Sequence, residues 1–468
     1  MSINHRRISL AIGANLILEV INKISPLLIL HHAQKSLGLA DFGWAQFQIA
    51  FIESVQPFIS FGFANFALAH AKDNEPSELR SLLSHLLTLK AFNAGLVLVF
   101  FLFQDMSSFD PASLAILLVV LISWVFEAFW LCIVRDKLIV VSLATGLLRA
   151  LSLVLILLLV RQPEDRLLFV LLSIVPSAII AFGTGTYAYL KLSFSRVSWT
   201  RLRQVLVQST PFAIVVLFAT LLDRLDIFTA EQLFGAAGTG IYSGPARVIL
   251  SVSMVLSSLA LPFFAETRKI EDADSLYKHI VMSLWFMTVL IAPLVFGLPW
   301  VEAPLVDLLF PKLPASASGL FSLLSISLIG SVLLSVFGVQ LLLAKGRPWA
   351  VVGAIFIGLL VIPVFSYVFQ KKLGLHGVAM ALVLAKIAVG FAVVYCARCY
   401  LPRLPWKPFF KPMLAGAGMW LTLSLIRPSS LWVALPVGAL SYGLCLLISS
   451  WKEFHELISL VKARRSPS

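Results

Sequence analysis

The stretch LFATLLDRLDIF, residues 217–228, places three charged side chains inside an apolar run. Eleven charged side chains in all lie within segments that are otherwise apolar enough to cross a membrane. Six are basic and five acidic: Lys23, Lys90, Arg149, Arg224, Arg247 and Lys386, and Glu19, Glu53, Glu127, Asp223 and Asp226. If all of them faced lipid, the cost would be roughly 30 kcal/mol, beyond the about 5–15 kcal/mol stability of an ordinary fold. We therefore expect most of them to face an aqueous interior.

The composition is that of an integral membrane protein. Of 468 residues, 59% are hydrophobic and 13% charged, against about 25% charged in soluble proteins. The mean hydropathy is +0.95. A net charge of +13 does not indicate nucleic acid here, because the basic excess lies in short loops. The CxxC pair Cys396 and Cys399 ends a predicted span and has no second pair, which favours packing thiols over a metal or cofactor site.

Apolar windows of about 20 residues predict an all-α polytopic membrane protein with about 14 spans. The predicted spans are 8–31, 43–69, 81–104, 112–134, 138–160, 167–190, 206–229, 239–264, 279–298, 317–344, 349–369, 375–397, 409–426 and 430–451. With the N-terminus inside, the inner segments hold 23 Lys and Arg residues and the outer loops hold 7. This asymmetry follows the positive-inside rule and predicts that both termini are cytoplasmic.

The spans predict four parts. Residues 1–190 form an N-terminal six-helix lobe, 191–205 a cytoplasmic basic linker, 206–400 a C-terminal six-helix lobe, and 401–468 the last two helices with a basic tail. The linker carries basic and aromatic residues. Its charges can set the orientation of the chain or contact lipid headgroups, and the sequence leaves both open.

A glycine motif recurs in the two halves. Gly38-Leu-Ala-Asp-Phe-Gly43 precedes the second span, and Gly235-Ala-Ala-Gly-Thr-Gly240 precedes the eighth. A shorter echo, Gly374-Leu-His-Gly377, precedes the twelfth. Each set of glycines permits a tight turn and a close approach of helices where the chain re-enters the membrane. The repeat predicts two bundles related by an axis along the membrane normal.

Helical spacing indicates which charges face the interior. Glu19 and Lys23 share one polar stripe and can neutralise each other as a structural pair. Asp223 and Asp226 lie one turn apart on a predicted helix, with Arg224 between them. Lys90, Glu127, Arg149 and Lys386 are single charges on their spans, and such charges more often tie helices together or snorkel to the interface than bind a ligand.

Together these side chains predict a cavity of net positive character. Arg and Lys suit phosphate and carboxylate groups, so the cargo is expected to be anionic. The candidate substrate-binding residues are Lys23, Lys90, Arg149, Arg224, Arg247 and Lys386. The candidate ion-coupling residues are Glu19, Glu53, Glu127, Asp223 and Asp226. No catalytic residue, metal or cofactor is predicted.

Two neighbouring stretches carry a resemblance to a known family. Asp223-Arg-Leu-Asp-Ile-Phe, followed by Phe234-Gly-Ala-Ala-Gly-Thr-Gly-Ile-Tyr-Ser-Gly-Pro-Ala-Arg247, resembles the junction of helices seven and eight in Wzx-type polysaccharide flippases. Leu343-Ala-Lys-Gly-Arg-Pro348 and Leu373-Gly-Leu-His-Gly-Val-Ala379 resemble later turns of that family. One departure is Gly244-Pro245, where an uninterrupted helix is usual. The family belongs to the multidrug/oligosaccharidyl-lipid/polysaccharide exporter superfamily.

The resemblance implies a V-shaped, MATE-like fold in the bacterial inner membrane. It implies a flippase that moves undecaprenyl-pyrophosphate-linked oligosaccharide, an O-antigen or exopolysaccharide repeat unit, to the outer leaflet by alternating access. Implied partners are the polyprenyl-pyrophosphate cargo, membrane lipids, a polysaccharide polymerase and a chain-length regulator, with no nucleic acid.

Three other functions are weighed against this one. A lipid II flippase needs the same cationic interior. A cation-coupled MATE-type drug exporter needs carboxylates that outweigh the bases, and six bases stand against five acids. A membrane-embedded polysaccharide polymerase or ligase needs a sizeable outer loop, and the predicted outer loops are short.

Overall fold

A computed structural model of the chain describes residues 5–70, 75–103, 111–135, 137–268, 270–310, 313–401, 403–427 and 430–463. The side chains of residues 5–28 and 451–463 are outside this description, as are those of a few single residues elsewhere. The predicted site residues Glu19 and Lys23 fall in the first of these ranges. Their backbone belongs to the first helix, and their side chains lie outside the described residues.

The described residues are almost entirely helical, as expected of apolar segments that must satisfy their backbone hydrogen bonds internally in lipid. In chain order the α-helices are α1 (His5–Ser60), α2 (Phe63–His70), α3 (Pro76–Leu102), α4 (Pro111–Phe126), α5 (Phe129–Val134), α6 (Leu138–Leu159), α7 (Arg166–Leu192), α8 (Trp199–Leu222), α9 (Leu225–Thr267), α10 (Ala273–Leu309), α11 (Leu320–Ser325), α12 (Ser327–Leu333), α13 (Pro348–Leu373), α14 (Leu375–Ala397), α15 (Trp406–Ile426) and α16 (Leu431–Ala463). Short 3-10 turns are η2 (Pro163–Asp165), η3 (Ala315–Ala317) and η5 (Arg398–Tyr400), and η4 (Leu334–Leu343) is a π-helix.

Among the described residues, 11 segments are long and apolar enough to cross a membrane. The structure therefore confirms an all-helical, multi-pass membrane protein, and the number of 14 spans stays a prediction. One of the 11 segments, Trp199–Ser257, contains predicted span 206–229 and most of 239–264. Helix α1, which contains span 8–31 and most of 43–69, is not among the 11.

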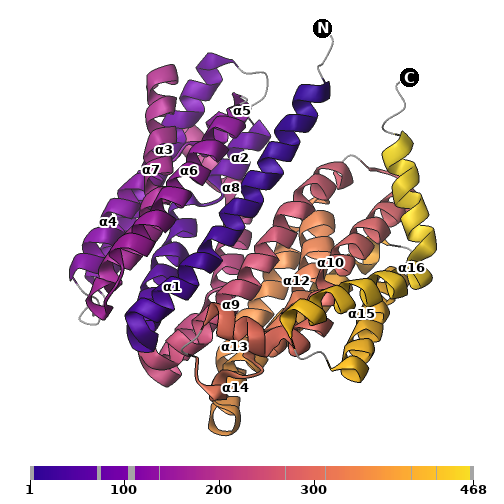
Figure 1. Ribbon diagram of the computed structural model, residues 1–468. Helices are drawn as coiled ribbons and strands as arrows, with labels where there is room; N and C mark the ends of the chain where they lie inside the picture. The colour runs from indigo at the N-terminus through magenta and orange to yellow at the C-terminus, as the bar shows by residue number, and fades with distance from the viewer. Residues whose placement is uncertain are drawn as a thin grey trace. The chain divides into compact units, whose positions relative to one another are not determined.

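The chain divides into two compact units, Met1–Ser243 and Gly244–Ser468. Helix α8 and the start of α9 therefore belong with the preceding helices, whereas the sequence predicts a division at residues 191–205. Within the first unit, α1 begins at the same end as the connection between α7 and α8 (Figure 1). In the second unit, α13 packs along α14, and α15 along α16 (Figure 1).

The repeated glycines occupy the turns that the sequence predicts for them. Gly38 in α1 has φ +79°, Gly235 in α9 has φ +66°, and Gly374 between α13 and α14 has φ +55°. All three adopt the left-handed conformation that side chains with a Cβ rarely adopt. At the first two, the helix kinks sharply. The kink at Gly38 lies inside α1, between two predicted spans, and the kink at Gly235 lies inside α9, before predicted span 239–264.

The second glycine of each motif permits a close helix contact. A Cβ on Gly43 would overlap the backbone of Ala236 and Gly240, and one on Gly240 would overlap the backbone of Leu39. The repeat-related glycines therefore contact each other within the first unit. Both predicted roles of the motif, the turn and the close approach, are confirmed.

This contact predicts a large effect of a single methyl group. We expect Gly240→Ala to destabilise the protein by about 1–3 kcal/mol, because backbone atoms of Leu39 have to move aside. Gly95→Ala is the matched control, since a Cβ there meets nothing within 4 Å. Thermal unfolding of the detergent-solubilised protein measures both, and equal midpoints for the two variants would contradict the contact.

Four predicted spans are interrupted among the described residues. Span 43–69 breaks at Phe61 and Gly62, between α1 and α2. Span 112–134 breaks at Glu127 and Ala128, and span 206–229 breaks at Asp223 and Arg224. Span 317–344 divides into α11, α12 and the π-helix η4. The prediction that Asp223 and Asp226 lie on one uninterrupted helix is therefore wrong. In contrast, α9 stays helical through Gly244 and Pro245, the point at which the sequence departs from the family pattern.

Candidate functional site

A buried arginine marks the break between α8 and α9. The backbone N–H of Arg224 donates to the carbonyl oxygen of Leu221 at 3.1 Å, three residues back, which tightens the turn. Nη2 of Arg224 contacts Oε2 of Glu53 on α1 at 2.5 Å. The Arg224 side chain is 6% exposed and that of Glu53 is 37% exposed. A buried guanidinium needs a neutralising partner, and the tight turn aims Arg224 at the helix that supplies one.

Arg224 also has hydrogen-bonding capacity in reserve. Its Nη1 atom is buried and has no hydrogen-bond partner among the residues that the structure describes. A guanidinium offers five donors in a planar fork, which matches the oxygens of a phosphate or carboxylate. An anion can therefore approach Arg224 at Nη1.

Asp226, two residues further along and in the first turn of α9, is held differently. Its Oδ2 accepts a hydrogen bond from the Tyr242 hydroxyl at 2.8 Å, and its Oδ1 accepts one from the backbone N–H of Ile227 at 2.9 Å. Asp226 and Tyr242 are both buried. We call Glu53, Arg224, Asp226 and Tyr242 the Arg224 cluster.

Tyr242 is a member of this cluster that sequence reasoning missed. A signal was present, because a turn at Gly235 folds the following helix back along the preceding one. Asp226 lies nine residues before that glycine and Tyr242 seven residues after it, so they come level with each other. The sequence predicts the turn, but the pairing of Tyr242 with Asp226 that follows from it was missed.

Lys90 and Glu127, which the sequence presents as single charges on separate spans, form one ion pair. Nζ of Lys90 donates to Oε2 of Glu127 at 2.6 Å and to its backbone oxygen at 2.7 Å. The other carboxylate oxygen accepts from the N–H of Phe129, at the start of α5, at 2.7 Å. The break between α4 and α5 exposes backbone groups that the pair satisfies, so this geometry favours a tie between helices.

This pair predicts a clear double-mutant cycle. We expect Lys90→Met to destabilise the protein by about 3 kcal/mol, because it leaves a largely buried carboxylate without its cation. Adding Glu127→Gln removes the unpaired charge and restores most of that loss. The thermal unfolding midpoints of the two single variants and the double variant measure the coupling, and strictly additive effects would contradict it.

The remaining predicted side chains are distributed over both units. Arg149 is half-buried on α6 and Asp223 half-buried at the end of α8, in the first unit. Arg247 is half-buried on α9 and Lys386 is buried on α14, in the second unit. Each of these four has an interaction partner within the chain. Within the second unit, α12 approaches α14 so closely at Lys386 that a Cβ on Gly330 would overlap its backbone.

Glu302 on α10 is a buried carboxylate in the second unit that the sequence analysis did not single out. It accepts hydrogen bonds from the backbone N–H of Phe321 at 3.2 Å and of Ser322 at 3.1 Å, and from the Ser322 hydroxyl. These groups begin α11, where the first N–H donors of a helix lack partners. Glu302 therefore caps a short helix segment and has a structural explanation.

Comparisons with known proteins agree with this architecture. No family model matches the chain, and no curated protein matches its sequence. Among solved structures, it is similar to the lipid II flippase MurJ in an inward closed conformation, with TM-score 0.74 and 14% identity, over 96% of this chain and 99% of that one. It is also similar to a multidrug resistance MATE family transporter of the MOP superfamily, with TM-score 0.55 and 15% identity, over 82% and 97%.

At these identities the similarity concerns the fold. The chain has the all-helical membrane fold shared by MurJ and the MATE transporters of the MOP superfamily. The similarity to MurJ extends over nearly the full length of both chains.

Proposed function

We propose that this protein is a flippase for a polyprenyl-pyrophosphate-linked saccharide. The observation that carries the proposal is Arg224, a buried guanidinium paired with Glu53 whose Nη1 has no hydrogen-bond partner among the described side chains. Pyrophosphate suits such a group, because two parallel hydrogen bonds to phosphate oxygens give both strength and orientation. The MurJ-like fold supports a lipid-linked cargo.

The identity of the saccharide separates two versions of this proposal. The sequence favours an O-antigen or exopolysaccharide repeat unit, through the resemblance to Wzx-type flippases. The full-length similarity to a lipid II flippase supports lipid II instead, and we give that version precedence. Both cargoes share the pyrophosphate, so the same cationic side chains serve either one.

In the proposed mechanism, the cargo phosphate competes with Glu53 for Arg224. Glu53 neutralises the guanidinium when no cargo is bound, which avoids a lone buried charge. Bound pyrophosphate takes over that role, and the displaced carboxylate becomes available for a proton or for water. Movement of a negative headgroup outward is favoured by roughly 2.3 kcal/mol per charge per 100 mV of inside-negative potential.

The other predicted residues enter this proposal unequally. We keep Lys23, Arg149, Arg247 and Lys386 as cargo-binding candidates, and Glu19 and Asp223 beside Glu53 as coupling candidates. We leave out Lys90 and Glu127, because their pairing explains their presence in the apolar segments. Asp226 is held by Tyr242, which favours a positioning role for it.

A drug exporter of the same fold remains the alternative from another transport class. It predicts carboxylates that are available to an organic cation. Two carboxylates of the Arg224 cluster do not fit this. Glu53 is paired with the Arg224 guanidinium, and Asp226 accepts a hydrogen bond from the Tyr242 hydroxyl.

A charge swap tests the role of Arg224. We expect Arg224→Glu to abolish outward movement of the lipid-linked saccharide. The double variant Glu53→Arg with Arg224→Glu should recover folding but not transport, because the ion pair re-forms while the buried cation is displaced. The measurement is accumulation of inward-facing lipid-linked saccharide in deletion cells that express each variant at matched levels.

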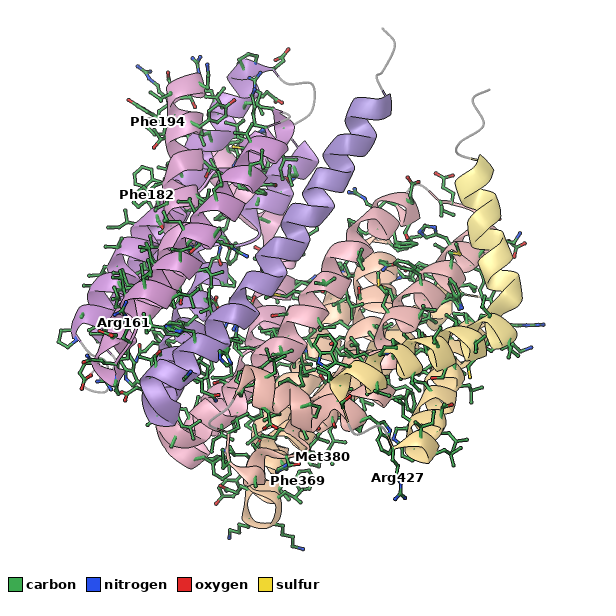
Figure 2. All side chains as sticks on the ribbon, viewed as in Figure 1. Arg161, Phe182, Phe194, Phe369, Met380 and Arg427 are labelled. Atoms are coloured by element: carbon green, nitrogen blue, oxygen red, sulfur yellow. The ribbon has the colours of Figure 1, made fainter. Side chains whose placement is uncertain are left out.

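Arg427→Glu is the control, since Arg427 lies exposed in the turn between α15 and α16 (Figure 2). Full transport by the swapped double variant would mean that the pair is structural only. The same measurement in cells that make lipid II, and in cells that make a lipid-linked polysaccharide repeat unit, then shows which of the two cargoes depends on this protein.

A further inference from the structure

The connection between α7 and α8 is fastened at both of its ends. Leu192, the last residue of α7, and Val205, in the second turn of α8, are almost fully buried. Both belong to one apolar cluster that includes Leu82, Leu83 and Leu86 of α3. The intervening residues are therefore held against α3 by burial on either side.

Two hydrogen bonds to side chains of α3 fix the backbone between Leu192 and Val205. Ser84 Oγ accepts a hydrogen bond from the N–H of Ser195 at 2.8 Å, and Nε2 of His85 accepts one from the N–H of Ser198 at 3.1 Å. Nδ1 of His85 lies 2.6 Å from the carbonyl oxygen of Ser81 and must donate to it. Since a backbone N–H can only donate and a carbonyl can only accept, these partners fix one neutral tautomer of His85.

This fixed backbone presents aromatic rings and cations to the surroundings. Trp199 is 79% exposed and Phe194 is 50% exposed. Lys191, Arg196 and Arg203 are exposed beside them. No acidic residue occurs between Arg166 and Asp223. Figure 2 shows Phe194 at one end of the first unit, with Arg161 at the other.

We propose that residues 191–203, the α7–α8 segment, bind the headgroups of anionic phospholipids. Tryptophan and other aromatic rings prefer the boundary between hydrocarbon and water, where one side of the ring is apolar and the other is hydrated. Basic side chains close to that boundary are attracted by anionic headgroups. The segment combines the two on one preordered backbone, so less conformational entropy is lost on binding.

An orientation-setting loop would need only the charges. It would not need two backbone hydrogen bonds to α3, nor the exposed side chain of Trp199. The preordered backbone is therefore the feature that separates lipid binding from the orientation role that the sequence leaves open. This inference concerns a surface apart from the Arg224 cluster and does not depend on which cargo is moved.

Native mass spectrometry of the purified full-length protein tests the proposal, with phosphatidylglycerol and phosphatidylcholine as probes. We expect phosphatidylglycerol to bind preferentially. Each basic side chain near an anionic surface strengthens binding about fivefold, so Arg196→Gln with Arg203→Gln should weaken it about 25-fold. Lys371→Gln with Lys372→Gln is the matched control, because it removes two exposed cations at the end of α13 and should leave this binding unchanged.

Two outcomes would overturn the proposal. One is equal loss of phosphatidylglycerol in the arginine and lysine double variants, which would mean that net charge alone retains the lipid. The other is full competition by soluble glycerol phosphate, which would mean a free-anion site. His85→Gln, with all cations kept, should weaken phosphatidylglycerol binding several-fold, and unchanged binding would refute the role of the preordered backbone.

Discussion

The pairing of buried charge is the constraint on which the described parts of this protein depend. A charge inside an apolar segment is tolerated only with a partner or with water. The structure answers this requirement in two ways. Lys90 contacts Glu127 and a backbone carbonyl, whereas Arg224 pairs with Glu53 and, among the described residues, its Nη1 has no hydrogen-bond partner. The first arrangement is explained by the fold alone, and the second is the basis of the proposed anion binding.

Helix breaks bring these partners together. Glu127 lies in the gap between α4 and α5, and Arg224 in the gap between α8 and α9. An interrupted helix leaves backbone groups without helical partners, and at Glu127 the ion pair satisfies some of them. Non-helical backbone at membrane depth is tolerated where protein encloses it or where it lines a polar cavity. The charged side chains and the breaks are therefore parts of one arrangement.

The glycine repeat combines two structural roles, a turn and a close helix contact. Gly38 and Gly235 turn the chain, and Gly43 and Gly240 then allow the two re-entering helices to touch. The turn at Gly235 also brings Tyr242 level with Asp226. A motif recognised as a spacing pattern thus sets both a helix contact and the environment of a carboxylate. The MurJ-like fold fits such a chain, in which repeated elements build a helical membrane protein.

The sequence by itself determined the membrane class, the helical architecture and the glycine turns, because hydropathy and backbone sterics act over short stretches of chain. It also singled out the charged side chains whose burial needs an explanation. Only the tertiary structure decided their partners: Glu53 for Arg224, Glu127 for Lys90 and Tyr242 for Asp226. Helical spacing reports the face on which a side chain lies, but not what a neighbouring helix presents to that face. Ion pairs between residues far apart in sequence depend on helix packing and on small breaks such as the one at Arg224, and neither leaves a mark in local hydropathy.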